Sequence, residues 1–201
     1  SPVLPIFQNL KRVLNMNATK PLLQFEAINQ NAQGVPVIVV AAGSFSRMNG
    51  VNKQLAQIGG IPVIIRTLMA FERCKKISDI ILVVRADDIF SMQLLTEKYN
   101  ISKLSDIVCG GKSRQESVLK GFSRIAENET AVLIHDGARP LVSENIISSV
   151  AEALKVYPAV TCAVKLKDTV KQVDKDGKII KNLPRDELVA VQTPQGVKVK
   201  E

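Results

Sequence analysis

The chain of 201 residues has no tryptophan, a single histidine, three cysteines and only 4% aromatic residues. No apolar run approaches the ~20 residues that a membrane-spanning helix needs, so we expect no membrane partner. Cys74, Cys109 and Cys162 lie far apart and lack the C-x-x-C spacing of a zinc site. These absences argue against a disulfide framework and a zinc module, and they predict a protein of the reducing cytoplasm.

The net charge of +8 comes from 27 lysines and arginines against 19 aspartates and glutamates. Such an excess suits either a nucleic-acid partner or small phosphorylated ligands. The low aromatic content and the lack of a dense basic run argue against nucleic acid, and we expect none. The 46% hydrophobic and 23% charged residues are typical of a soluble globular domain.

Apolar runs alternate with amphipathic helical patterns along most of the chain. Unbroken apolar runs are typical of strands buried on both faces, as in a parallel sheet under helices. We therefore expect an α/β fold, with a Rossmann-like three-layer wound, mostly parallel sheet and helices on both faces. The predicted strands are 37–40, 80–84, 106–109, 131–134 and 159–164. Four helices are predicted, which begin after Pro62, at a cap formed by Asp87 or Asp88, at a Ser113 cap and at a Ser143 cap. The last of these helices is expected to bury Ile146, Ile147, Val150 and Leu154.

Two segments differ from this pattern. Residues 1–34 mix Asn, Gln, Lys and Pro, and we expect an N-terminal appendage ahead of a main domain over 35–201. From Lys165 the chain shows half-polar alternation around an Asp-Gly turn at 174–177, which predicts a β-hairpin. Because the alternation is weakly amphipathic, we expect the hairpin to project as an arm over about 165–187.

Ligands of an open α/β sheet bind outside the carboxyl ends of its strands, so the residues after each run are candidates. The first run ends in the small residues 41–44, which let backbone N–H groups approach a phosphate. Arg47 and Lys53 follow, and together they predict a nucleoside-triphosphate site without a G-x-G-x-x-G or G-K-[ST] motif. Taken alone, the two cations are more simply explained as solvated surface residues.

Two later loops carry further candidates. Gly110 to Ser117 lead into a helix whose free N–H groups suit an anion, although a plain capped helix start explains them more simply. Asp136 at a strand end beside a phosphate loop suits Mg²⁺, which takes one or two carboxylates plus phosphate oxygens. For His135 and Arg139 the sequence favours structural roles, as a hydrogen-bonding residue and an ion-pair partner.

Taken together, these motifs resemble the 2-C-methyl-D-erythritol 4-phosphate cytidylyltransferase family of the non-mevalonate isoprenoid pathway. All of them fall in the family's order, and the match covers Val35 to about Val197. The matching pieces are 41–43 with Arg47, Met48 and 52–54; Gly110-Gly111 with Arg114 and 117–118; 135–140; 167–171; and Arg185 ahead of 192–195.

The resemblance implies that CTP reacts with a sugar-alcohol phosphate, giving a CDP-linked product and pyrophosphate with Mg²⁺. It implies that Arg47 and Lys53 stabilise the transition state. It also implies a homodimer in which the arm over 165–187 reaches into the partner subunit. The nucleotide would be wrapped by Ala41, Ala42, Gly43 and Ser44, and its base, ribose or metal bound by Gly111, Ser117, Asp136 and Ala138, with Asp136 as metal ligand. Arg185, Thr169 and Thr193 would position the acceptor.

The chain departs from the family pattern at two places. Phe45 stands where the family often has a small residue. The chain ends at Glu201, whereas the family continues for a few dozen residues, so we expect a C-terminally truncated domain. Two alternatives stay open: a sister enzyme acting on ribitol 5-phosphate or another polyol phosphate, and a non-catalytic nucleotide-binding or dimerisation module. Gly137-Ala138 and the run 190–193 favour the isoprenoid branch.

Overall fold

The computed structural model describes residues 34–43 and 53–199. The predicted site residues Ser44 and Arg47, together with Phe45 and residues 1–33 of the expected appendage, lie outside the described residues. Within the described ranges, no helix is both long enough and apolar enough to cross a membrane.

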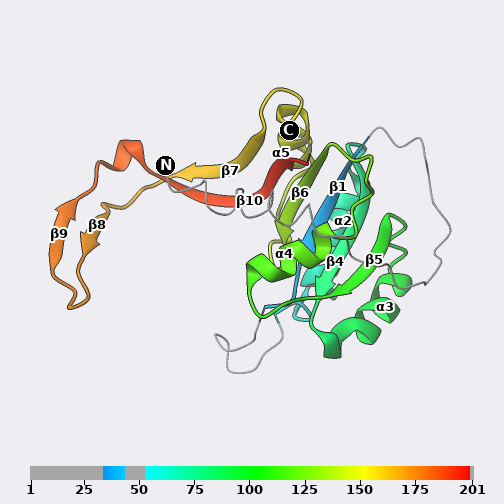
Figure 1. Cartoon of the computed structure of the whole chain (residues 1–201). Helices are drawn as coiled ribbons and strands as arrows, with labels where there is room; N and C mark the ends of the chain where they lie inside the picture. The colour runs from blue at the N-terminus through cyan, green and yellow to red at the C-terminus, as the bar shows by residue number, and fades with distance from the viewer. Residues whose placement is uncertain (1–33, 44–52, 200–201) are drawn as a thin grey trace.

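A six-stranded sheet with the order β5-β4-β1-β6-β10-β7 forms the centre of the fold (Figure 1). Strands β5, β4, β1 and β6 run parallel to one another, and β10 runs antiparallel to both β6 and β7. The prediction of a mostly parallel wound sheet is therefore confirmed. The strands are β1 (Val35–Val40), β4 (Ile77–Val84), β5 (Leu104–Cys109), β6 (Ala131–Asp136), β7 (Ala159–Lys165) and β10 (Val189–Lys198). A small separate hairpin pairs β2 (Gln57–Ile58) with β3 (Ile61–Pro62).

Helices cover both faces of the sheet, which makes the three predicted layers. On one face, α2 (Val63–Arg73), α3 (Ile89–Lys98) and α5 (Glu144–Ala153) enclose the larger apolar core, in which Phe71 and Ile147 pack with Val39. On the other face, α4 (Arg114–Phe122) packs against Ile38 and Val83 in a smaller core. Gly121 lets α4 approach closely, because a Cβ there would lie 2.5 Å from a methyl of Ile38.

Helix α2 begins directly after Pro62, as predicted, and of the three predicted side-chain caps two are right and one is wrong. Ser113 and Ser143 cap α4 and α5, because their hydroxyl groups accept hydrogen bonds from the N–H groups of Glu116 and Ile146. Asp88 precedes α3 without a side-chain cap bond, because its carboxylate instead accepts two hydrogen bonds from the Arg85 guanidinium, at 2.9 and 3.1 Å. Ile146, predicted to be buried, is 43% exposed because it faces an open pocket rather than the core.

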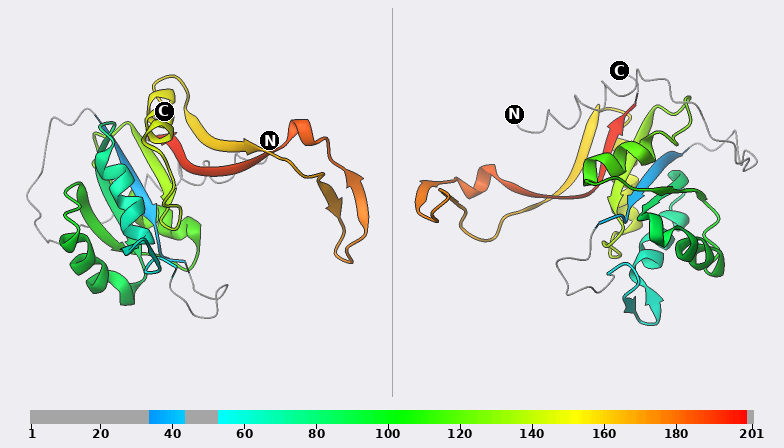
Figure 2. Two further views of the ribbon diagram at one scale, coloured as in Figure 1. Left: turned by 180° about the vertical axis from the view of Figure 1, so that it is seen from behind. Right: turned by 60° about the horizontal axis from the view of Figure 1, so that its bottom comes forward.

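The predicted arm is present and projects from the body. Strands β7 and β10 extend outward and carry the hairpin of β8 (Lys171–Val173) and β9 (Ile179–Asn182) at their far end (Figures 1 and 2). The carboxylate of Asp174 organises the turn by accepting from the N–H groups of Asp176 and Lys178, both at 2.9 Å, and Gly177 supplies a positive φ of 82°. The two hairpin strands have every residue exposed, including the apolar side chains of Val173 and Ile179.

Candidate active site

Loops from three strands meet at the carboxyl edge of the sheet. The loop after β1 touches the turn after β5, because a Cβ on Gly110 would lie only 2.3 Å from the Cβ of Ala42. The same loop touches the loop after β6, because a Cβ on Gly137 would lie 3.1 Å from the Cβ of Ala41 and 3.1 Å from Oε1 of Gln54. The loops can approach so closely only because these positions carry glycine or alanine, and Gly43 at the end of the described part of the first loop is exposed.

Ser117 on α4 holds the turn that follows β5. Its hydroxyl accepts a hydrogen bond from the N–H of Gly111 at 3.1 Å and donates one to the carbonyl of Ser113 at 2.9 Å. The side chain is 2% exposed, so its hydroxyl lies under the turn rather than at the surface. Ser117 therefore holds the turn from below, and its contact with the nucleotide stays a prediction.

Asp136 at the end of β6 lies between two arginines. Its Oδ1 accepts a hydrogen bond from Nε of Arg114 on α4 at 3.1 Å and forms an ion pair with that guanidinium, and its Oδ2 accepts from Nε of Arg139 at 3.0 Å. Its backbone N–H donates to Oγ1 of Thr193 on β10 at 3.3 Å. The expected ion-pair role of Arg139 is confirmed, and its guanidinium also donates to the side-chain carbonyl of Gln192.

Asp136 is thus the point where α4, the loop after β6 and strand β10 are tied together. Arg114 and Gln192 belong to the matching motifs, but the sequence pattern predicts no role for either side chain. Their pairing with the 136–139 loop joins residues 22 and 53 positions apart, which local pattern reasoning does not detect.

His135 is a structural residue, as the sequence favoured. It is fully buried, its ring packs edge-on against Phe71 with centroids 4.9 Å apart, and its Nε2 lies 3.1 Å from the carbonyl oxygen of Arg139. Because a carbonyl oxygen only accepts, Nε2 carries the proton and donates. Burial is the largest influence on the ring, and it lowers the pKa of His135 to about 4.

This lowered pKa predicts a loss of stability in acid. The folded protein holds His135 neutral and the unfolded chain protonates it near pH 6.5, so stability is full above that value and falls as the pH drops toward 4. The shift corresponds to about 3 kcal/mol across this window. Urea unfolding at pH 7.0, 5.5 and 4.5 measures it. His135→Gln keeps an N–H donor but does not titrate, so its stability should fall less between these pH values; an equally steep loss in the variant would contradict the assignment.

The structure brings most of the predicted nucleotide residues to one edge. Lys53 is exposed in a turn. The side chain of the next residue, Gln54, lies against Gly137 in the loop after β6. The backbone carbonyl of Gln54 accepts a hydrogen bond from the N–H of Ile64 in α2 at 3.0 Å. Thr193 is 9% exposed and is hydrogen-bonded to Asp136. The predicted residues at or next to this edge are Ala41, Ala42, Gly43, Lys53, Gly111, Ser117, Asp136, Ala138 and Thr193.

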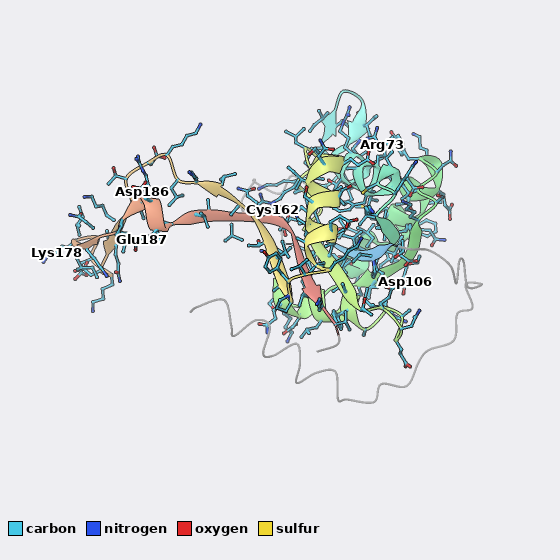
Figure 3. All side chains as sticks on the ribbon, turned by 90° about the horizontal axis from the view of Figure 1, so that it is seen from above. Arg73, Asp106, Cys162, Lys178, Asp186 and Glu187 are labelled. Carbon is cyan, nitrogen blue, oxygen red and sulfur yellow. The ribbon has the colours of Figure 1, made fainter. Side chains whose placement is uncertain are left out.

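Thr169 and Arg185 are not at this edge of the same chain. Both are exposed in the arm, where Nη1 of Arg185 donates to the carbonyl of Lys167 at 3.0 Å. Figure 3 shows the arm residues Asp186 and Glu187 far from the body that carries Arg73 and Asp106. The two predicted acceptor residues of the arm are therefore separated from the loops within one chain.

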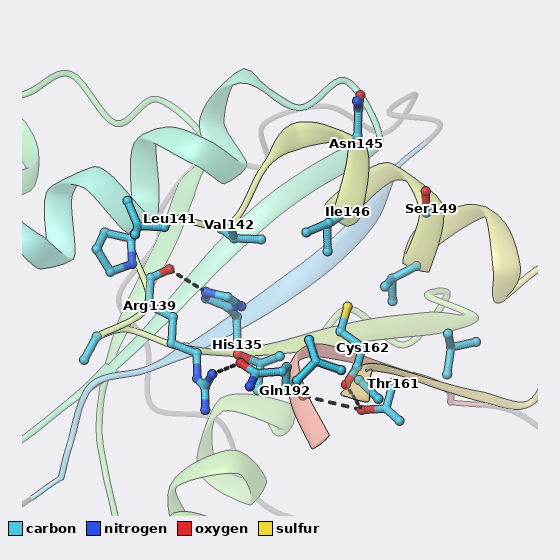
Figure 4. A pocket seen from close by; sticks show the side chains of 17 residues that line it. His135, Arg139, Leu141, Val142, Asn145, Ile146, Ser149, Thr161, Cys162 and Gln192 are labelled. Atoms are coloured by element: carbon cyan, nitrogen blue, oxygen red, sulfur yellow. Dashed lines mark hydrogen bonds between the residues drawn. The ribbon is translucent and has the colours of Figure 1, made fainter. Parts of the chain in front are cut away.

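A pocket of about 840 Å³ opens beside the loop after β6 (Figure 4). Its polar end carries Arg139, Gln192 and Thr193, and its apolar walls come from α5 and β7, with Ile146 and Val164 among the lining residues. It lies next to Asp136, through the hydrogen bond of that residue to Thr193.

A wound α/β sheet with small-residue loops and cations gathered at the carboxyl ends of its strands defines a nucleotide-binding protein of the Rossmann-like class. The profile of the IspD family, described as 2-C-methyl-D-erythritol 4-phosphate cytidylyltransferase, matches residues 35–201. A protein of that name from Clostridium novyi is 44% identical over 160 residues, which cover 79% of this chain and 69% of the relative. The chain therefore belongs to the 2-C-methyl-D-erythritol 4-phosphate cytidylyltransferase family, an enzyme family of the nucleotidyltransferase class.

Further relatives and solved structures agree with this assignment. A protein of the same name from Halalkalibacterium halodurans is 42% identical over 160 residues, covering 79% of this chain and 69% of the relative. The crystal structure of 4-diphosphocytidyl-2C-methyl-D-erythritol synthase from Anaerococcus prevotii superposes with a TM-score of 0.72 at 34% identity, covering 84% of this chain and 71% of that one. The Francisella tularensis enzyme gives 0.65 at 28% identity, covering 83% and 73%.

Proposed function

We propose that this chain transfers the cytidylyl group of CTP to 2-C-methyl-D-erythritol 4-phosphate and releases pyrophosphate. The observation that carries the proposal is the convergence of the loops after β1, β5 and β6 around Asp136, in a chain 44% identical to a relative named for this reaction. The backbone left open by Ala41, Ala42 and Gly43 would receive the triphosphate, and Gly111 and Ser117 the base or ribose.

The proposed reaction needs positioning and charge neutralisation rather than a general base. An oxygen of the acceptor phosphate forms the new bond to the α-phosphorus of CTP while the bond from that phosphorus to the β-bridging oxygen breaks. The acceptor phosphate is already an oxyanion, so no proton has to be removed from it. The chain's single histidine, His135, is buried and hydrogen-bonded to the backbone, so it is not placed to act as a general base. Lys53 and Arg47 would neutralise the charge that builds on the α-phosphate.

Asp136 fits a divalent cation as a single carboxylate ligand. It stands at the end of β6, its side chain is 32% exposed, and each of its two carboxylate oxygens accepts one hydrogen bond from an arginine, so about two of its four lone-pair positions remain. Within the described residues there is no group of three or more His, Cys, Asp or Glu side chains that could hold a metal ion. Mg²⁺ would therefore be held largely by the phosphates of CTP, whose charge it neutralises, with at most one position from Asp136.

We propose that the acceptor binds between the body of one subunit and the arm of another, in a cytoplasmic homodimer. Thr193 lines the pocket beside Asp136, whereas Thr169 and Arg185 lie out on the arm, so one chain alone does not bring them together. The arm also exposes apolar side chains at Val173, Ile179 and Ile180, each more than half accessible. Exposed apolar surface on a projecting element is typical of a subunit interface.

Release of pyrophosphate from CTP tests the proposal directly. The protein is incubated with CTP, Mg²⁺ and 2-C-methyl-D-erythritol 4-phosphate, and in parallel with ribitol 5-phosphate. We expect release that depends on the methylerythritol acceptor. Faster release with ribitol 5-phosphate would favour the sister enzyme, and CTP binding by calorimetry without any release would favour a non-catalytic nucleotide-binding module.

A further inference from the structure

The turn after β5 has to leave the edge of the sheet to reach the nucleotide loop. Strand β5 is the edge strand and is separated from β1 by β4. Yet Gly110 packs directly on Ala42, and its N–H donates to the carbonyl of Val84, the last residue of β4, at 2.7 Å. The turn therefore crosses the end of β4, and a segment that bends inward from an edge strand needs anchors outside the sheet.

Helix α4 supplies these anchors through three side chains in its first two turns. Ser117 accepts from the N–H of Gly111 at 3.1 Å, as described above. Oε2 of Glu116 accepts from the N–H of Lys112 at 2.7 Å, and the ammonium of Lys120 donates to the carbonyl of Gly110 at 2.9 Å. The helix itself is fixed to the sheet through Gly121, so the anchors come from a rigid element.

Lys120 is the anchor that no motif contains. Among the described residues, the other hydrogen bond to the carbonyl of Gly110 comes from the Cys109 thiol, a weak donor, at 3.5 Å. The bond from Lys120 is charge-assisted and therefore the stronger of the two. Loss of Lys120 would leave this carbonyl held only by the thiol, and the position of Gly110 against Ala42 would loosen.

We propose that Lys120 is a positioning residue for nucleotide binding, acting through the carbonyl of Gly110 and not by contact with the nucleotide. The inference rests on the proposed function in one respect, that the loops of residues 41–43 and 110–117 receive CTP. It predicts an effect on CTP affinity with little effect on turnover at saturation, because Lys120 holds the carbonyl of Gly110, whereas the turn of Lys53 is tied to α2 by a different hydrogen bond, from Ile64 N–H to Gln54.

The test compares Lys120→Met, which keeps the aliphatic stem, with Lys120→Arg, which keeps a charged donor. We expect Lys120→Met to raise the KM for CTP and the calorimetric Kd for CTP about three- to ten-fold, the size of one charge-assisted hydrogen bond on an exposed side chain. The kcat should stay within about twofold, and Lys120→Arg should recover most of the affinity. Lys98→Met is the matched control, because Lys98 is an exposed lysine on α3 that contacts the ring of Tyr99.

Salt separates positioning from long-range attraction between the ammonium and CTP. The ratio of variant to wild-type KM is measured at 0.1 M and about 0.5 M salt, where charges beyond a few ångströms are screened. A ratio that persists supports positioning, and a ratio that falls to one overturns it. An unchanged Kd in Lys120→Met, or a loss confined to kcat, also overturns it. Calorimetry measures CTP binding without the acceptor. If the wild type showed no turnover, the proposed reaction would be wrong, and the calorimetric Kd would still test the role of Lys120.

Discussion

Replacement of Lys53 by alanine is expected to lower kcat by about 10²–10³-fold while the protein stays folded. Lys53 is exposed in a turn tied to α2 by the hydrogen bond from Ile64 N–H to the carbonyl of Gln54. The side chain therefore contributes little to the core, and its loss removes a cation from the position where charge builds on the α-phosphate. Steady-state pyrophosphate release measures the rate, and circular dichroism measures the fold.

Two further variants sharpen this expectation. Lys53→Arg keeps the charge and should retain more activity than Lys53→Ala. Lys75→Ala removes an exposed lysine from the segment between α2 and β4 and should leave turnover unchanged. Near-wild-type turnover in folded Lys53→Ala would remove Lys53 from the catalytic set. The resemblance predicts the same loss for Arg47→Ala.

Arg185→Ala is expected to be nearly inactive alone and to regain activity when mixed with Lys53→Ala. In a dimer with exchanged arms, each site combines Lys53 of one chain with Arg185 of the other. A mixed dimer then holds one site that lacks both residues and one that is intact. Random reassociation of equal amounts places half the molecules in mixed dimers, so mixing should restore roughly a quarter of wild-type activity.

The mixing experiment has a built-in control. If Arg185 served the site of its own chain, every site in a mixed dimer would lack one of the two residues, and activity would stay at the level of the single variants. Co-purification of untagged Lys53→Ala with tagged Arg185→Ala checks that the subunits exchange. A protein that remains monomeric at assay concentrations by light scattering, yet is fully active, would contradict the arm-exchanged dimer itself.

Much of the fold follows from local sequence signals. The apolar runs at Val37–Val40 and Ile80–Val84 are long and uninterrupted, so they predict buried strands without knowledge of their neighbours, and β1 and β4 contain them. Ser113 and Ser143 are predicted as caps because each stands directly before an amphipathic helical pattern, and in the structure both hydroxyls accept the cap hydrogen bond. Asp88 stands at an equally good cap position but has a bidentate arginine three residues earlier, and that ion pair takes its carboxylate. The preference of aspartate for cap positions takes no account of a neighbouring arginine that can bind the same carboxylate.

The site was predictable to the extent that it lies at strand ends. Because the carboxyl ends of parallel strands share one edge of a sheet, loops distant in sequence could be expected to meet, and the contact between Ala42 and Gly110 confirms this for the loops after β1 and β5. The partners of Asp136 could not be predicted, since they depend on how α4 and β10 pack. The hydrogen bond from Lys120 to the carbonyl of Gly110 could not be predicted either, because it depends on how α4 is oriented relative to the turn after β5.

The length of the arm can change without a change in the sheet that forms the site. The register between β10 and β7 shifts between Val191 and Gln195, at the point where the arm joins the body, while Gln195–Lys198 keep their own pairing with β6. Adding or removing two residues in each strand of the hairpin changes its reach by about 7 Å and keeps the other side chains on the same face. In the proposed dimer the hairpin would act as a spacer: its length would set the separation of the two sites, while the sheet that forms each site stays the same.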